Sequence, residues 1–422
     1  MKRMAANFNL EINETQGGSI NGNIDYKPNI CYNANLILQN IALKRYIPIA
    51  NIGPLSANIN IKGQGYDLNS TNTDFNIDAN ISKLKYAGDD FSGSAMQCRF
   101  TDGMLFADIT STAAHAQGNV SFEGMLSQNN TSATLGINLS NLDLNFFDIV
   151  DSPFKIGACG HIDIDSDFKN NHAMYGHMSN MCITDSLQTY HPDDIELNIL
   201  AHADTTDIDV VCGDFKLCAN ANEGYSSLME VYGIISEEIN RQWTERTIDE
   251  SNLRRKLPTA TLYMKTGHEN PLARFMSYIG YGFSSAYIDM KTSPVAGING
   301  TLSVDTLNTN GILLDKISAN LISDTDKISY DISIANGQDN PQYSFAALLK
   351  GEVINDGTTC TLTIDDKNGM RGIDIGISAV VEAEHIGLKF HDRPQILGYK
   401  EFMPNKNNAI RIGQGMRLSS DV

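Results

Sequence analysis

Apolar and polar residues alternate through the segment 153–168, PFKIGACGHIDIDSDF. Phe154, Ile156, Ile162 and Ile164 share one parity, and the other parity is polar and largely acidic. Successive side chains of a β-strand point to opposite faces, so the segment predicts a strand with one apolar and one polar face. The apolar face needs a cover, which is either another layer of protein or something that the chain does not encode.

The same alternation recurs along most of the chain, between turns rich in Gly, Asn and Asp, and predicts half-buried antiparallel strands. In 133–147 the apolar parity shifts between Leu139 and Leu142, which predicts a β-bulge or a bend. The positions expected on the apolar face are Leu55, Ala57, Ile59, Ile61, Ile137, Leu139, Phe154, Ile156, Ile162, Ile164, Ile328, Tyr330, Ile332, Ile373, Ile375 and Ile377.

A long-range repeat accompanies the alternation. Residues 36–67 align with residues 137–168, since both read as a strand, an Asn with apolar neighbours, an irregular linker, a Pro and a second alternating strand. A repeat of about 100 residues predicts β-units that stack and bury their edges against one another. We therefore expect repeating β-groove units over 1–225, a helical insertion over 226–280, and a continuing groove over 281–422.

Residues 227–257 break the alternation and predict one long amphipathic helix. Ser227 and Glu230 have the spacing of a capping box, and Pro258 follows the expected end. The expected apolar stripe and the expected i,i+4 ion pairs are Leu228, Val231, Ile235 and Ile239, with Glu237–Arg241 and Glu250–Arg254. A shorter helix is predicted in 270–280, with Asn270 as N-cap, Pro271 in the first turn and Gly280 at the end.

Composition narrows the possible functions. The formal net charge of −19 and the lack of a basic cluster disfavour nucleic acid as a partner. The seven cysteines are scattered and form no CxxC pair, so they predict small buried apolar residues rather than a zinc site or a disulfide framework. No apolar run is long enough for a transmembrane helix, and both ends of the sequence have the character of cuts in a longer protein.

No constellation of residues indicates catalysis. Asp163, Asp165 and Asp167 begin like an EF-hand loop, but Phe168 and Met174 occupy the positions that need Gly and Glu. The histidines lack metal-ligand spacing, and nucleophile motifs and phosphate-binding glycine loops are missing from the sequence. We expect no enzyme, no cofactor and no metal.

The second half of the chain resembles a known family. After the long helical segment come the blocks 270–283, 289–324, 341–353, 369–390 and 393–413, beginning with NPLARFMSYIGYGF. Their order, from about Leu228 to Val422, resembles the TamB (translocation and assembly module) family in the long AsmA-like group of envelope proteins. The match over the preceding β-repeats is looser.

The resemblance implies a fold and a setting. The fold is mainly β: a long antiparallel sheet curled into a groove, polar outside and apolar inside, with one long and one short helix. Members span the periplasm, are anchored in the inner membrane by an N-terminal helix, and work with a BamA/TamA-type outer-membrane barrel or move phospholipid. We expect any such anchor to lie upstream of this sequence. The apolar positions given above would then line a groove for phospholipid acyl chains.

Other functions remain open at this stage. Strands of a client barrel could pair with open sheet edges by β-augmentation. An extracellular β-solenoid adhesin or carbohydrate-binding protein would need aromatic platforms, but aromatic residues are scattered and make up 8% of the chain. An outer-membrane barrel would need aromatic girdles, which the sequence lacks.

Overall fold

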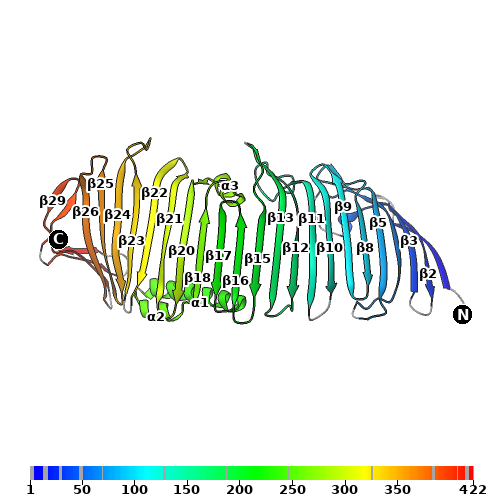
Figure 1. Ribbon diagram of the computed structural model, residues 1–422, viewed down its shortest axis with the longest axis horizontal. Coiled ribbons are helices and arrows are strands. Elements are labelled where there is room, and N and C mark those ends of the chain that lie inside the picture. Colours follow the sequence, from blue (N-terminus) through cyan, green and yellow to red (C-terminus); the bar gives the residue numbers. More distant parts are fainter. Residues whose placement is uncertain are drawn as a thin grey trace. The chain divides into compact units, whose positions relative to one another are not determined.

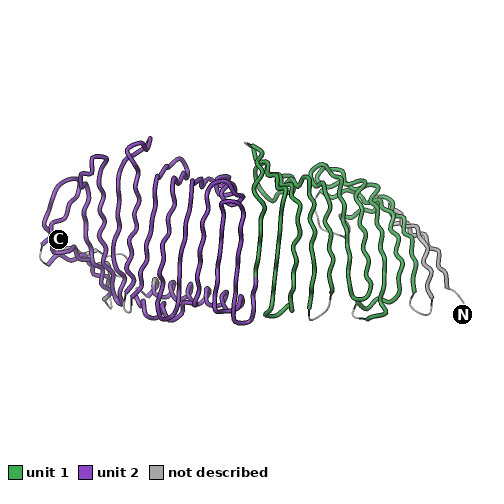
Figure 2. The backbone as a smooth tube through the Cα atoms, viewed as in Figure 1, with its two compact units in different colours: residues 1–199 green, residues 200–422 purple. Residues whose placement is uncertain are grey.

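The computed structural model describes residues 4–12, 18–27, 31–46, 51–68, 70–126, 130–186, 188–245, 247–324, 327–382, 385–405, 407–413 and 418–421. The protein is mainly β, with 61% strand, and its large antiparallel sheet is not closed. The expected fold class is therefore confirmed. The chain divides into two compact units, residues 1–199 and 200–422 (Figure 2). The three-part division at 225/226 and 280/281 follows the sequence pattern and remains a prediction.

The first unit is an antiparallel meander in which most strands pair with their neighbours along the chain (Figure 1). A short hairpin of β6 and β7 forms a separate two-stranded sheet. The strands are β1 (Met4–Ile12), β2 (Gly18–Lys27), β3 (Cys31–Ile41), β4 (Leu55–Gln64), β5 (Asp74–Lys83), β6 (Lys85–Tyr86), β7 (Asp89–Asp90), β8 (Ala95–Thr101), β9 (Met104–Ala113), β10 (Ala116–Leu126), β11 (Thr131–Asp143), β12 (Lys155–Ser166), β13 (His172–Thr184), β14 (Thr189–Tyr190) and β15 (Ile195–Ala201), with a 3-10 turn at Leu43–Arg45.

A register shift interrupts the pairing of β11 with β12 between Leu139 and Leu142. The bulge predicted from the change of apolar parity is therefore confirmed. The pairing of β3 with β4 shifts in the same way between Leu38 and Ile41. An extra residue at these points keeps the apolar side chains on one face although the simple alternation is broken.

The two segments that align in the sequence also share their pairing. Leu36 lies opposite Ile59, and 101 residues further along Ile137 lies opposite Gly160. The register shifts described above are separated by the same interval. The repeat in the sequence thus corresponds to a repeat of strand register within the first unit.

The second unit continues as an antiparallel meander and carries the α-helices of the described chain (Figure 1). Its helices are α1 (Tyr225–Glu245), α2 (Glu250–Arg255) and α3 (Pro271–Tyr278). Its strands are β16 (Thr206–Cys212), β17 (Phe215–Ala221), β18 (Ala260–Thr266), β19 (Tyr281–Gly282), β20 (Ser285–Ser293), β21 (Gly297–Thr309), β22 (Ile312–Ser323), β23 (Lys327–Asn336), β24 (Phe345–Ile354), β25 (Gly357–Asp366), β26 (Arg371–Glu382), β27 (His385–Phe390), β28 (Gln395–Leu397), β29 (Lys400–Phe402), β30 (Ala409–Gly413) and β31 (Leu418–Asp421).

The prediction of one helix over 227–257 is wrong, because the chain leaves the helix between α1 and α2. The second helix has its own N-cap: the Asp249 carboxylate accepts the backbone N–H of Asn252 at 2.8 Å. The first helix begins at Tyr225, so Ser227 lies inside it and the predicted capping box is also wrong. An N-cap at Asp249 therefore starts a second helix where the amphipathic pattern alone predicts that the first continues.

The predicted apolar stripe of the first helix holds only in its N-terminal half. Leu228, Val231 and Ile235 are half-buried, whereas Ile239 is 51% exposed and Glu238 is only 5% exposed. Among the described side chains in the C-terminal half of α1, the buried ones are the polar Glu238 and Gln242. The expected burial of Ile239 is therefore wrong.

The predicted ion pairs divide in the same way. Glu250 and Arg254 form the expected i,i+4 pair, with Nη2 and Oε1 2.6 Å apart and both side chains buried. Arg241, however, pairs with Glu238 and Glu245 in place of Glu237.

The short helix matches its prediction. Asn270 caps α3 by accepting the N–H of Ala273 at 2.9 Å, and Pro271 stands in the first turn. Gly280 follows the helix with a φ of +94°, a left-handed conformation that favours glycine.

Candidate functional site

The register of the first unit brings its predicted apolar positions onto one face of the sheet. Side chains of directly opposite residues lie on the same face. Ile137 lies opposite Gly160 in β12, and Ile162 lies opposite Leu135 in β11. An unbroken row of such pairs leads across the unit through Ile59, Ala79, Met96, Ile109, Val120 and Ile137.

Phe154 is the one predicted position of this unit that lies outside the strand pairing. It precedes β12 and is half-buried. Its backbone carbonyl accepts the N–H of Leu144 at 2.8 Å. The pairing therefore does not place its side chain on the apolar face.

The predicted positions of the second unit also share one face. Pairs run from Ile332 to Leu349, then to Leu362 and to Ile375. Neighbouring rows on the same face contain Tyr330, Gly351, Cys360 and Ile377, and Ile334, Ala347, Ile364 and Ile373. Ile328 shares the parity of this face in β23. Each unit thus carries an apolar face, defined here by these rows.

The large side chains of the apolar faces are only half-buried. Of the sixteen predicted positions, only Ala57 is buried, at 3% exposure, and the others are intermediate. Among the described residues thirteen hydrophobic side chains are buried, and eight of these are alanines. Phe100 is the only large apolar side chain among those under 2% exposed. Same-face neighbours flank the predicted positions within the strands, which apart from Ala57 keep part of their side chains accessible to solvent.

The total surface supports the same conclusion. A compact protein of 46.2 kDa exposes about 16,000 Å², and two separate compact proteins of half that mass expose about 19,000 Å². This chain exposes 25,229 Å². The excess indicates that the chain buries less of its surface than compact proteins of this mass do.

Glycines on the apolar faces mark places where neighbouring strands approach closely. A Cβ atom at Gly160 would lie 2.2 Å from the carbonyl oxygen of His177, and one at Gly351 would lie 2.1 Å from that of Thr359. A side chain larger than that of glycine at these two positions would therefore meet the backbone of the neighbouring strand.

The opposite face is polar and satisfies many of its own hydrogen bonds. Asn35 donates to Asn60 at 2.6 Å, and Thr134 donates to Asp163 at 2.5 Å. Asp167, from the EF-hand-like run, closes the β12–β13 turn by accepting the N–H of Asn171 at 2.9 Å. Hydrogen bonds from Asn171 and other turn residues hold the pKa of Asp167 well below its usual range. Within the described ranges no group of three or more His, Cys, Asp or Glu side chains could hold a metal ion.

The expectation that most cysteines are buried is wrong. Only Cys212 is buried, and the other six are half-buried. Cys159 and Cys218 lie on the polar face, where their thiols donate to Asn138 at 3.2 Å and to Asp209 at 2.8 Å. An open sheet offers few fully enclosed positions, even to small side chains.

The first two helices cover part of the apolar face of the second unit. Figure 1 shows α1 and α2 running across the lower ends of its strands. Leu228 of α1, together with Ala219 and Leu262 of the sheet, lines a cavity of about 270 Å³. On other sides of α1, Met229 and Tyr232 are 56% and 73% exposed.

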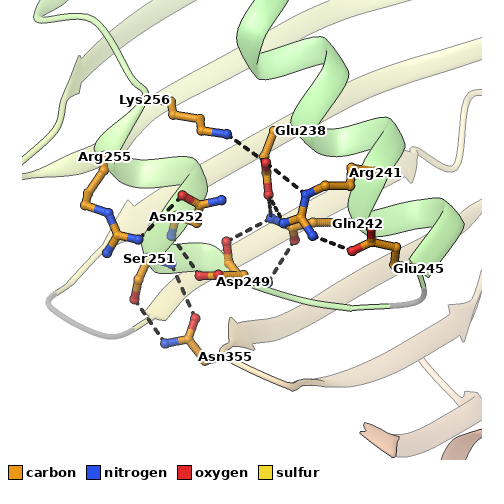
Figure 3. A network of polar contacts seen from close by, with 10 residues as sticks. All are labelled: Glu238, Arg241, Gln242, Glu245, Asp249, Ser251, Asn252, Arg255, Lys256 and Asn355. Carbon is orange, nitrogen blue, oxygen red and sulfur yellow. Dashed lines mark hydrogen bonds and ion pairs between the residues drawn. The ribbon is translucent and has the colours of Figure 1, made fainter. Parts of the chain in front are cut away.

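A polar network fixes α1 to α2, and Figure 3 shows its members converging from both helices. Glu238 accepts from Lys256 at 2.7 Å and from Gln242 at 2.9 Å, and it pairs with Arg241. Gln242 also accepts the N–H of Asp249 at 2.8 Å. Hydrogen bonds from Arg241, Lys256 and Gln242 hold the pKa of Glu238 well below its usual range. We call these five residues the α1–α2 network.

The network region is also tied to the sheet. Asn355, in the β24–β25 turn, accepts the N–H of Ser251 at 3.3 Å and donates to its hydroxyl at 3.0 Å (Figure 3). The N–H of Asp356 donates to the carbonyl of Ile248 at 2.8 Å. Sequence reasoning identified the ionic character of 237–256 but not this arrangement, because its partners come from a turn about 100 residues away.

In the part of the chain that the structure describes, no helix has both the length and the apolar character needed to cross a bilayer.

Comparison of the chain with protein-family models, with curated proteins and with solved structures finds no match.

Proposed function

We propose that this protein is a conduit for lipid acyl chains, which lie on the apolar faces of its open sheet. The observation that carries the proposal is the incomplete burial of large aliphatic side chains, such as Ile162 and Ile164, along the apolar faces of the two units. Contiguous apolar surface that stays accessible to solvent is typical of binding surfaces.

The energetics favour an alkyl chain as the cover. Each buried methylene contributes about 0.8 kcal/mol, so six seated methylenes contribute about 5 kcal/mol. Rows of Ile, Leu, Val and Met offer a similar wall at successive strands, so a chain can shift from one row to the next without losing a specific contact. Transport along the face then needs no covalent chemistry.

The cellular setting comes from the resemblance to the TamB family. The resemblance implies a location between two membranes, phospholipid as the cargo and a BamA/TamA-type barrel as the partner. It also implies a second role for the same protein, the assembly or secretion of outer-membrane proteins. These parts of the proposal rest on the resemblance, whereas the acyl-chain surface rests on the register and exposure described above.

A pair of double variants tests the surface. Ile162→Asp with Ile164→Asp places two carboxylates on the apolar face of β12. Uptake of a fluorescent phospholipid from phosphatidylcholine vesicles should fall at least tenfold, since an unpaired carboxylate against an alkyl chain costs more than about 1.4 kcal/mol. The control is Cys159→Asp with His161→Asp, which adds the same side chains to the polar face of the same strand.

The control variant should take up lipid like the parent protein. If the parent takes up no lipid, or if both double variants lose uptake equally, the proposed function is wrong.

A further inference from the structure

The cavity under α1, which we call the α1 cavity, differs from the rest of the apolar face in being walled on two sides. Leu228 lies over strands β16, β17, β18 and β20, and the cavity measures about 270 Å³. Its apolar walls are Ile208, Ala219, Ala221, Leu228, Ala260, Leu262 and Met290. The space exists because three of these sheet positions are alanine, where longer side chains would fill it.

The polar side chains around the cavity are engaged elsewhere. Thr206 donates to the carbonyl of Glu223 at 2.9 Å, and Thr292 donates to the carbonyl of Pro258 at 2.8 Å. Thr261 donates to Asn220 at 3.3 Å. These hydroxyl protons are therefore not directed at a ligand in the cavity. Since an unmatched polar group is costly to bury, the cavity favours an alkyl ligand over a polar one.

The cavity is continuous with the apolar face. Leu262 lies opposite Met290, Met290 lies opposite Gly300, and the same row continues through Leu321 to Tyr330. An alkyl chain that lies along this row would therefore enter the cavity by one of its ends. Its volume of about 270 Å³ is large enough for the end of one alkyl chain.

We infer that the α1 cavity is a terminal seat for the methyl end of one alkyl chain. This inference rests on the proposed function and adds a fixed stop to a face along which chains otherwise shift. The seat favours an apolar terminus, because its walls are aliphatic and its hydroxyl protons are directed elsewhere.

Photolabelling tests the seat in the full chain. Palmitic acid that carries a diazirine at its methyl end is bound and irradiated, and the labelled peptides are mapped by mass spectrometry. The label should concentrate on peptides that contain Leu228, Leu262 and Met290. In Ala260→Leu, labelling there should fall about fifteenfold, the effect of displacing two methylenes, while labelling of β12 persists. Ala219→Leu, on the neighbouring strand, should reduce labelling of the cavity peptides by the same factor. Agreement between the two variants would exclude a folding defect in one of them as the cause.

Ala346→Leu is the matched control, because it makes the same substitution on the polar face of β24, and it should label like the parent. Labelling of β12 without labelling of the cavity would refute the seat and leave the proposed function standing. Equal cavity labelling in the filled variants would also refute it. If no peptide of either unit is labelled, both proposals fail.

Discussion

Glu250 and Arg254 form an ion pair that is almost completely removed from solvent, with side-chain exposures of 1% and 9%. The second carboxylate oxygen of Glu250, Oε2, is buried without a hydrogen-bond partner among the described residues. The substitution Arg254→Met keeps much of the packing volume but leaves the carboxylate alone in the interior. Breaking a buried pair in this way typically costs about 3–5 kcal/mol.

We therefore expect a local destabilisation of about 3–5 kcal/mol in the region of α2, because the carboxylate of Glu250 loses its ion-pair partner.

Hydrogen exchange is the suitable assay, because a chain with two compact units need not unfold in one step. Protection should fall in 247–257 and at the amide of Asp356, which donates to Ile248. The double variant Glu250→Leu, Arg254→Met should protect this region at least as well as the parent, since it removes both charges and the unpartnered oxygen. Unchanged protection in Arg254→Met, or a loss in the double variant as large as that in Arg254→Met, would refute this reasoning.

Two further predictions concern the close approach of neighbouring strands at Gly160 and the contact between α1 and α2. Gly160→Ala should destabilise β11–β13 by about 1–3 kcal/mol through overpacking, seen as faster exchange, whereas Gly176→Ala on the same face has only ordinary contacts and should not. Similar exchange in both would contradict the close approach. The lowered pKa of Glu238 means that its stabilisation is present above its ordinary pKa and is lost as the pH falls below about 4. Exchange in α1–α2 should rise there, and Glu238→Gln should remove that acid dependence; a variant with the parent's acid response would overturn the assignment.

The strands and their irregularities could be predicted well from the sequence. The alternation in 153–168 identified β12, and the parity change between Leu139 and Leu142 identified a bulge that the register confirms. Both are local signals, since the faces of a strand are set by neighbouring residues in the chain. Once each strand pairs with the next, the same signals also place the apolar residues of distant segments on one face of the sheet.

The helical region was predicted less well because its partners are distant in sequence. Periodicity extends across 227–257, so it could not reveal the break, although Asp249, a residue type favoured at N-caps, is a signal that could have. The burial of Glu238 instead of Ile239 depends on Lys256, which reaches it only after the chain has turned back. No pattern within one helix encodes that contact.

For the candidate site, the apolar face could be predicted from the sequence, but the α1 cavity could not. The apolar positions of β12 and β23 could be assigned from parity alone. The α1 cavity depends on Ala219 and Ala260 lying beneath Leu228, and alanine in a strand gives no signal of what lies above it. Cavities arise from the relation between elements, and for that reason the structure was needed to find this one.

Because the strand register recurs after 101 residues, the first unit could be lengthened by inserting whole copies of this 101-residue repeat. A second copy of the stretch from β3 to β10, inserted ahead of β11, would present β11 with the same neighbour that it has now. Growth of this kind requires no new core, because each added strand is supported by the one before it. The length of such a unit is then an integer multiple of one module, which gene duplication can change.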